Sequence, residues 1–315
     1  MRTLGIDTSN YTTSAAVYDP AGECKNAGRL LDVPEGALGL RQSDALFAHV
    51  KRLPEQFEAL RAAGLLERIA AVAASARPRA VEGSYMPCFL AGASQGRVLA
   101  AALGVPFFEV SHQQGHIAAA AWSAGRLDLL DRTHLAWHLS GGTTELLLVE
   151  PEVGNVKAVR VGGTSDISAG QLIDRTGKLL NLAFPAGKAL DALSRTAGER
   201  TSFAVKVKGL EFSLSGVENK VKALAEEGKT AGEIAWFALD TVVQAVRRAT
   251  AEALGQWPGL PVLCSGGVAS NGRLREVLMG SCQAIFAEPQ YSTDNAMGPA
   301  LLASRFLERK LGKEL

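Results

Sequence analysis

Apolar and polar positions alternate along the chain in a way that predicts strands and helices in turn. Short runs of branched and small apolar residues predict buried strands, and longer stretches with an apolar residue every three to four positions predict amphipathic helices. The predicted strands are 2–6, 14–18, 69–74, 106–110, 135–139, 145–150, 261–264 and 284–287. The predicted helices are 44–63, which Pro54 is expected to kink, 92–103, 167–182, 185–197, 231–254, 271–279 and 295–311. This order is typical of an α/β protein.

One arrangement of elements occurs twice. A strand, a turn of small polar residues and a second strand open the chain, and the same order begins again at Leu135. The recurrence predicts two similar α/β domains. We place the first at residues 1–130 and the second at 131–294, and we expect the last helix (295–315) to pack back onto the first domain.

Length and charge narrow the class of protein. The chain has 315 residues with 33 basic and 32 acidic side chains, so its formal net charge is +1. This balance excludes nucleic-acid binding through a high overall positive charge. Any binding of nucleic acid would have to use local basic patches or a partner protein. Asp7 interrupts any apolar leader, no apolar run reaches membrane-spanning length, and the four cysteines form no CxxC motif. We therefore expect a cytoplasmic protein with free thiols and no membrane segment.

Three turns with similar chemistry follow predicted strands. They are 7–10 (Asp-Thr-Ser-Asn), 140–144 (Ser-Gly-Gly-Thr-Thr) and 265–267 (Ser-Gly-Gly), the last at a helix start. Glycine lets backbone N–H groups approach an anion, hydroxyls add donors, and a helix N-terminus adds partial positive charge. The set indicates phosphate or nucleotide binding, and the alternative is tight turns without a ligand.

A histidine pair is the second candidate feature. His112 and His116 are four residues apart, which places both rings on one face of a helix and within reach of one metal ion. Gln113 follows the first histidine, so the glutamate of a zinc-protease motif is absent. The alternative is that the pair only caps the helix. The remaining histidines, expected to be core or surface residues, are His49, His134 and His138.

Four aspartates complete the candidate set: Asp166, Asp174, Asp191 and Asp294. Asp174 adjoins Arg175 and fits a surface ion pair as well as a ligand contact. Asp294 precedes the last helix and fits an N-cap. A cap and a metal ligand look alike in a sequence, so local reasoning leaves both open.

These motifs, in this order, resemble the TsaD-type tRNA N6-adenosine threonylcarbamoyltransferases, formerly described as O-sialoglycoprotein endopeptidases. The resemblance implies the actin/Hsp70/sugar-kinase (ASKHA) fold, with two similar α/β domains around a nucleotide cleft. The matching stretches are 4–9, 110–116, 139–146, 169–175, 178–180, 184–187, 212–216, 265–271 and 292–295.

The resemblance also implies site residues. His112, His116 and Asp294 would hold a divalent metal, Fe2+ or Zn2+. Residues 138–142 would contact the phosphate and acyl part of the substrate, and Asp174, Gly187, Asp191 and Asn271 its adenosine end. The full set implied for substrate or nucleotide is Asp7, Ser9, His138, Leu139, Ser140, Gly141, Gly142, Asp174, Gly187, Asp191, Gly266, Gly267 and Asn271.

The implied reaction is transfer of threonylcarbamoyl from threonylcarbamoyl-AMP to N6 of adenosine 37 in ANN-decoding tRNA, in a site that also suits ATP, ADP or AMP. Implied partners are tRNA, other proteins of the pathway (TsaB- and TsaE-like), and a second copy or a paralogue as a dimer partner. The alternatives are a divergent paralogue with another acyl or phosphoryl substrate or a regulatory role, a metallopeptidase, and an ATPase or sugar kinase.

Several positions depart from the family pattern. Most lie near the expected phosphate end of the site, which favours a divergent member or paralogue. Two of them, Arg77 and Arg79, add charge that suits an anion, or are simply solvated. The departures are Asn10-Tyr11-Thr12, Arg77-Pro78-Arg79, Thr143, Glu145, Ile167 and Glu218.

Overall fold

The computed structural model describes residues 1–9, 11–32 and 40–311; Asn10 of the first turn and the end of the predicted last helix, 312–315, lie outside these ranges. The chain divides, as far as it is described, into two compact units. The first comprises Met1–Arg132, Glu150–Ala158 and Asp294–Leu315, and the second comprises Thr133–Val149 and Val159–Thr293. Of the second domain predicted at 131–294, residues 131–132, 150–158 and Asp294 group with the first unit.

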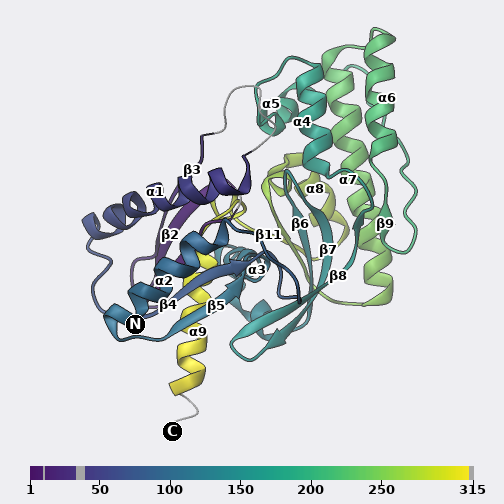
Figure 1. Cartoon of the computed structure of the whole chain (residues 1–315). Helices are drawn as coiled ribbons and strands as arrows, with labels where there is room; N and C mark the ends of the chain where they lie inside the picture. The colour runs from purple at the N-terminus through teal and green to yellow at the C-terminus, as the bar shows by residue number, and fades with distance from the viewer. Residues whose placement is uncertain (10, 33–39, 312–315) are drawn as a thin grey trace. The chain divides into compact units, whose positions relative to one another are not determined.

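The strands in the described ranges form two sheets (Figure 1). The first has the order β3-β2-β1-β4-β5, with β2 antiparallel to β1 and β3, and β4 parallel to β1 and β5. Its strands are β1 (Arg2–Asp7), β2 (Thr12–Tyr18), β3 (Lys25–Leu30), β4 (Ile69–Arg77) and β5 (Phe107–Ser111).

The second sheet has the order β11-β10-β6-β7-β8-β9. Its β6–β7 hairpin is antiparallel, and β6, β10 and β11 are parallel neighbours, as β1, β4 and β5 are in the first sheet. The repeated order confirms the prediction of two similar α/β halves. The strands are β6 (His134–Leu139), β7 (Thr144–Glu152), β8 (Asn155–Thr164), β9 (Glu211–Phe212), β10 (Val262–Ser265) and β11 (Ala284–Phe286).

The helices follow the predicted order, with α3 as the helix expected to carry the histidine pair and with α6 as an addition. Helix α1 continues through Pro54, which we expected to kink it. The α-helices are α1 (Gln42–Ala62), α2 (Phe89–Leu103), α3 (His112–Ser123), α4 (Ala169–Leu179), α5 (Gly187–Ser194), α6 (Ser215–Glu226), α7 (Ala231–Gln256), α8 (Gly272–Ser281) and α9 (Met297–Leu311). Short 3-10 turns are η1 (Leu127–Asp131), η2 (Gly267–Ser270) and η3 (Pro289–Tyr291).

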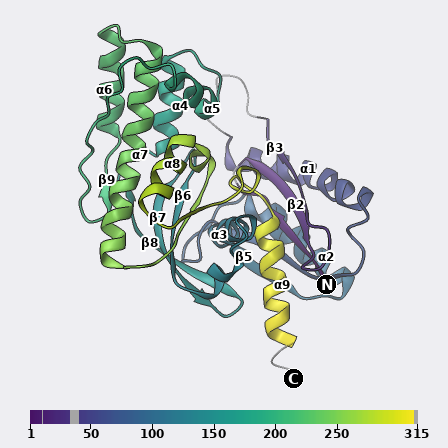
Figure 2. The ribbon, with the colours of Figure 1, turned by 180° about the vertical axis from the view of Figure 1, so that it is seen from behind.

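Alternating residues of β4 show how the first sheet is covered on both faces. Val72 and Ala74 pack into a cluster with Leu53 and Leu60 of α1. The intervening alanines, 71 and 73, pack with residues of α9. Helices α1 and α2 therefore lie on the side seen in Figure 1, and α9 lies on the side seen in Figure 2. This two-sided burial explains why β4 reads as a continuous small apolar run.

Gly5 of β1 permits the close approach of α9. A Cβ atom at this position would lie 2.2 Å from the carbonyl oxygen of Ala296 and 2.4 Å from the backbone nitrogen of Ala300. We expect Gly5→Ala to lower the free energy of unfolding by about 3 kcal/mol, because backbone must move to admit the methyl group. Urea denaturation measures this.

Gly28→Ala in β3 is the matched control, since its nearest neighbour is a side-chain atom 3.3 Å away. We expect it to change stability by less than about 1 kcal/mol. Equal unfolding midpoints for the two variants would contradict the close packing of α9 on β1.

The second core fixes the position of the turn after β6. Leu135, Trp137 and Leu139 point into a cluster formed largely with α7. The indole N–H of Trp137 donates to Thr250 Oγ1 at 2.9 Å, which locks β6 against that helix. His138 therefore lies on the opposite face of the sheet, and the Ser-Gly-Gly-Thr turn follows at the end of the strand.

Two general predictions concern covalent links and membranes. The four cysteines are free thiols, as predicted: Cys24, Cys88, Cys264 and Cys282. Among the described residues, no helix has the length of apolar chain that a bilayer span requires.

Candidate active site

A capping box fixes the start of α3, the helix that carries the histidine pair. The Ser111 hydroxyl accepts the Gln114 amide hydrogen at 3.2 Å, and Gln114 Oε1 accepts the Ser111 amide hydrogen at 2.9 Å. These two hydrogen bonds satisfy backbone N–H groups at the N-terminus of α3. The alternative that His112 and His116 serve as caps is therefore wrong.

His112, His116 and Asp294 converge in the first unit. The Nε2 atoms of His112 and His116 are 2.9 Å apart. Asp294 Oδ1 lies 3.3 Å from His116 Nε2 and 3.5 Å from His112 Nε2. Candidate ligand atoms of all three lie within 4.8 Å of one another. Asp294 does not cap α9; the Met297 amide donates instead to Asn295 Oδ1 at 3.0 Å.

Asp7 contacts the Nδ1 side of the His112 ring, away from His116. Its Oδ2 lies 2.9 Å from His112 Nδ1, and its Oδ1 accepts hydrogen bonds from both the amide, at 2.9 Å, and the hydroxyl of Ser9. The Asp7 side chain is almost fully buried. When Nδ1–H donates to Asp7, His112 Nε2 faces His116 and Asp294, so a metal that displaces the Nε2 proton would meet a correctly oriented lone pair.

Charge in the cluster favours a bound cation. Burial opposes the charged form of His112, but the Asp7 charge and the hydrogen bond to Asp294 outweigh it and raise the His112 pKa to about 10. Burial likewise acts against the Asp294 carboxylate, yet hydrogen bonds from His112 and His116 hold its pKa well below the usual range. Two carboxylates thus surround the imidazoles. Two nitrogen donors and one carboxylate suit a divalent metal such as iron or zinc, with positions left open for a ligand.

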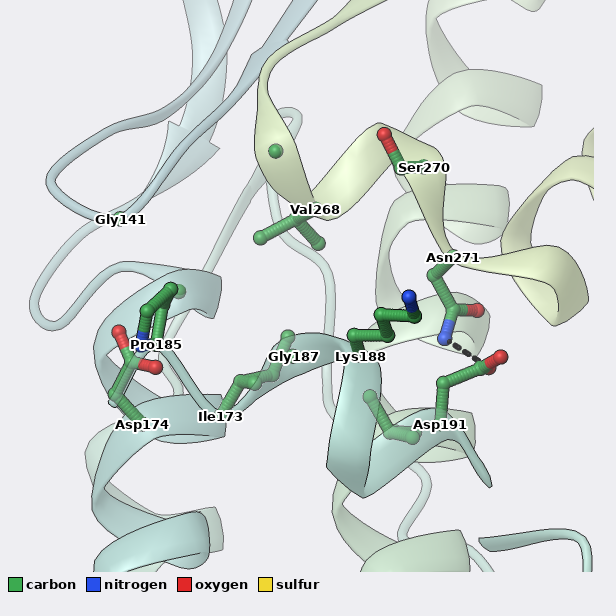
Figure 3. A pocket seen from close by; sticks show the side chains of 13 residues that line it. Gly141, Ile173, Asp174, Pro185, Gly187, Lys188, Asp191, Val268, Ser270 and Asn271 are labelled. Carbon is green, nitrogen blue, oxygen red and sulfur yellow. Dashed lines mark hydrogen bonds between the residues drawn. The ribbon is translucent and has the colours of Figure 1, made fainter. Parts of the chain in front are cut away.

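A cavity of about 460 Å³ lies within the second unit. Its volume is in the range of small-molecule and cofactor sites. In Figure 3, Asp174 and Pro185 lie toward one end, and Lys188, Asp191 and Asn271 toward the other. The lining residues are Gly141, Gly170, Ile173, Asp174, Pro185, Gly187, Lys188, Asp191, Leu239, Gly267, Val268, Ser270 and Asn271.

Hydrogen bonds hold the polar groups of this cavity in place. Asn271 Nδ2 donates to Asp191 Oδ1 at 2.7 Å, and Asn271 Oδ1 accepts the Leu274 amide hydrogen at 2.9 Å as the N-cap of α8. Asp191 Oδ2 also accepts from Arg195 at 2.8 Å. The carboxylate keeps lone pairs for a ligand, since ionised carboxyl groups accept several hydrogen bonds.

Asp174 is a cavity residue and not a surface ion pair. It is partly buried and accepts the Ala186 amide hydrogen at 2.9 Å. Burial raises the pKa of this carboxyl group. Arg175 pairs with Glu218 instead, at 2.6 Å. The ion-pair alternative is therefore wrong.

Glycines give the cavity its space. A Cβ at Gly187 would meet only Ile173 Cγ2, at 4.0 Å, and one at Gly267 would meet nothing within 4 Å. Gly266 has a different role, because its φ is +94° and a Cβ there would lie 2.1 Å from the carbonyl oxygen of Leu139. Only glycine fits that position.

Some of the predicted substrate residues line the cavity and others do not. It is lined by Gly141, Asp174, Gly187, Asp191, Gly267 and Asn271. The others do not line it: His138, Leu139, Ser140 and Gly142 lie on β6 or in the turn after it, and Gly266 follows β10. Asp7 lies beside His112, and Ser9 bonds to Asp7. Residues not predicted are Gly170, Ile173, Pro185, Lys188, Leu239, Val268 and Ser270.

Most of the missed residues had a signal, because they lie within or next to the stretches that carry the resemblance. Lys188 follows Gly187 and is one helical turn from Asp191 on α5. Leu239 had none, since it comes from the middle of α7 and has no motif around it.

The Arg77-Pro78-Arg79 turn lies beside the start of α3. The Pro78 carbonyl accepts the Gln113 amide hydrogen at 3.1 Å, and both arginines are exposed. The turn therefore adds positive charge next to the helix that carries the histidine pair.

Comparison with known proteins identifies the family of the chain. The family model of tRNA N6-adenosine threonylcarbamoyltransferases (TsaD) matches residues 39–301. A protein of that name from Sinorhizobium medicae (strain WSM419) is 34% identical over 327 residues, which cover 94% of this chain and 87% of the relative.

Solved structures are similar in fold at low identity. T. kodakarensis HypF has a TM-score of 0.61 at 15% identity, over 98% of this chain and 48% of that one. A ROK family glucokinase from Streptomyces griseus, in complex with glucose and AMPPNP, has a TM-score of 0.50 at 15% identity, over 97% and 100%. The fold is therefore of the predicted actin/Hsp70/sugar-kinase type. With the family model and the relative, these findings show that the chain is a transferase and belongs to the tRNA N6-adenosine threonylcarbamoyltransferase family.

Proposed function

We propose that this chain transfers a threonylcarbamoyl group from threonylcarbamoyl-AMP to N6 of adenosine 37 in ANN-decoding tRNA, and that it needs a divalent metal to do so. The convergence of His112, His116 and Asp294 within 4.8 Å carries the proposal. The relative's name and the family model support tRNA as the acceptor.

The metal would be held by His112 Nε2, His116 Nε2 and the Asp294 carboxylate. A metal at this position supplies Lewis-acid chemistry, because a divalent cation polarises a carbonyl oxygen. Asp7 orients His112 through the 2.9 Å contact to Nδ1 and keeps Nε2 free of that proton. Iron and zinc are the candidates, since both accept two imidazoles and one carboxylate.

The cavity would hold the adenylate part of the donor. Asp191, fixed by Asn271, would accept hydrogen bonds from ribose hydroxyls, and Gly187 and Gly267 leave room for the base and sugar. Exposed Lys188 supplies positive charge at the same cavity for the phosphate. Precise placement of the donor matters, because the N6 amine of adenine is a weak nucleophile.

The transfer itself is an acyl substitution. N6 attacks the carbonyl carbon, the bond from that carbon to the phosphate oxygen breaks, AMP leaves, and N6 loses one proton. The chain has a near-zero net charge, so we expect other proteins of the pathway, TsaB- and TsaE-like, to help bind tRNA. We place the reaction in the cytoplasm.

One assay tests this function. The purified chain is incubated with threonylcarbamoyl-AMP, unmodified tRNA and the pathway proteins. The tRNA is then digested to nucleosides, which are separated by liquid chromatography and identified by mass spectrometry. We expect threonylcarbamoyladenosine to accumulate and chelation to stop it. If nucleotide binds while no modified nucleoside forms, the chain is a paralogue with another substrate.

Asp7→Asn tests the orienting role of Asp7. The amide keeps the size of the side chain but removes the charge that holds His112 Nδ1–H, so we expect metal affinity to fall about 10- to 100-fold. Metal competition with a coloured chelator measures the affinity. The exposed Asp128, which pairs with Arg126 at 2.7 Å, gives the matched Asp128→Asn control, and an Asp7 variant with equal affinity would contradict the role.

A further inference from the structure

An exposed aromatic side chain adjoins the cavity. Phe184 lies in the loop between α4 and α5 and is 83% exposed. The next residue, Pro185, lines the cavity, and the amide of Ala186 is tied to Asp174 at 2.9 Å. The loop therefore presents a large, solvent-exposed aromatic ring at a defined place beside the cavity.

Cationic side chains lie on both sides of this loop along the chain. Between residues 169 and 197 the chain has four cationic side chains and two carboxylates. Both carboxylates, Asp174 and Asp191, are cavity residues that already accept hydrogen bonds. The cationic side chains are all exposed: Arg175, Lys178, Lys188 and Arg195. Arg175 pairs with Glu218 and Arg195 pairs with Asp191, so Lys178 and Lys188 are the two cations of this stretch outside those pairs.

The geometry points to Phe184 as a stacking platform for an unpaired base of the RNA substrate, with Lys178 and Lys188 bound to its phosphates. This inference rests on the proposed function, because it takes the acceptor to be an RNA loop. Proteins recognise such loops by stacking splayed bases on aromatic rings, and basic side chains hold the backbone. A protein partner would be expected to cover the ring without needing the cations.

A fluorescent RNA tests the inference. An anticodon stem-loop is made with 2-aminopurine at an unpaired position next to adenosine 37, and it is titrated with the full chain and the pathway proteins. Anisotropy gives the Kd, and quenching of 2-aminopurine reports stacking. Binding of AMP to each variant is measured in parallel.

We expect Phe184→Ala to raise the Kd for RNA about 5- to 140-fold, which is the range for loss of one stacked base. Quenching at saturation should disappear, and the Kd for AMP should stay within about twofold, since the ring does not line the cavity. Phe184→Trp should retain both binding and quenching.

Phe47 on α1 is the matched control. It is 66% exposed and also has a cation nearby, Lys51 Nζ at 5.4 Å from the ring centroid, but it does not line the cavity. Phe47→Ala should bind RNA as the unaltered chain does. Equal Kd and quenching in Phe184→Ala would overturn the inference, and weaker binding of a pathway protein with unchanged quenching would assign the ring to that protein. If the unaltered chain binds AMP but no RNA, the proposed function itself fails.

Discussion

Replacing both His112 and His116 by alanine is expected to remove the bound metal and the transfer activity together. Their Nε2 atoms are 2.9 Å apart and share Asp294 Oδ1, so no other pair of donors in the cluster replaces them. We expect metal content to fall from about one ion to less than about 0.1 ion per chain. Transfer should slow at least about 100-fold, because carbonyl polarisation is worth several kcal/mol. Elemental analysis and the nucleoside assay measure the two effects.

Gln113→Ala is the control for this variant. Gln113 lies between the two histidines on the same helix, and its backbone amide makes the bond to Pro78 that the substitution retains. It should keep its metal. Circular dichroism shows whether the double variant is folded. A folded double variant with unchanged metal content would contradict the role of His112 and His116 as metal ligands.

Gly187→Leu is expected to abolish nucleotide binding while the fold survives. The new side chain would enter the cavity, because the nearest atom to a Cβ there is Ile173 Cγ2 at 4.0 Å. We expect the Kd for AMP to rise at least about 100-fold, or about 2.8 kcal/mol. Stability should change by less than about 1 kcal/mol, since the added Cβ makes no close contact and residue 187 is exposed. Isothermal titration calorimetry and urea unfolding measure the two quantities.

The matched control is Gly255→Leu near the end of α7. It is an exposed glycine with nothing within 4 Å of an added Cβ, and it does not line the cavity. The control should bind AMP as the unaltered chain does. Equal AMP binding by Gly187→Leu would show that the nucleotide does not occupy this cavity.

The elements that the periodicity predicts are those with a strong burial pattern. Helix α7 has buried residues along most of its length and is buried on every side over 237–243, and β4 is buried from both sides. The missed elements bury little: the last three residues of β3 are exposed, and α6 buries only Val217 and Val221. Strand β8 was missed because its exposed residues do not alternate regularly with buried ones. These segments form strands and helices because they contact neighbouring parts of the fold, and their local sequence pattern alone does not predict them.

The candidate site was partly predictable for similar reasons. The histidine pair is local, and its i, i+4 spacing on a helix is enough to bring the rings together. Asp294 is 178 residues from His116, so only the family resemblance linked them. Asp7 was expected in a phosphate-binding turn, but its carboxylate is held by Ser9 and directed at His112. Such long-range partners depend on how strands order in the sheet, which the local pattern does not specify.

Anomalous X-ray diffraction from crystals of the metal-loaded chain is the most direct measurement of the central claim. We expect one peak at the absorption edge of iron or zinc, about 2.0–2.2 Å from His112 Nε2, His116 Nε2 and an oxygen of Asp294. A fully loaded, active protein whose anomalous peak lies elsewhere, with these three side chains bound only to one another, would contradict the account.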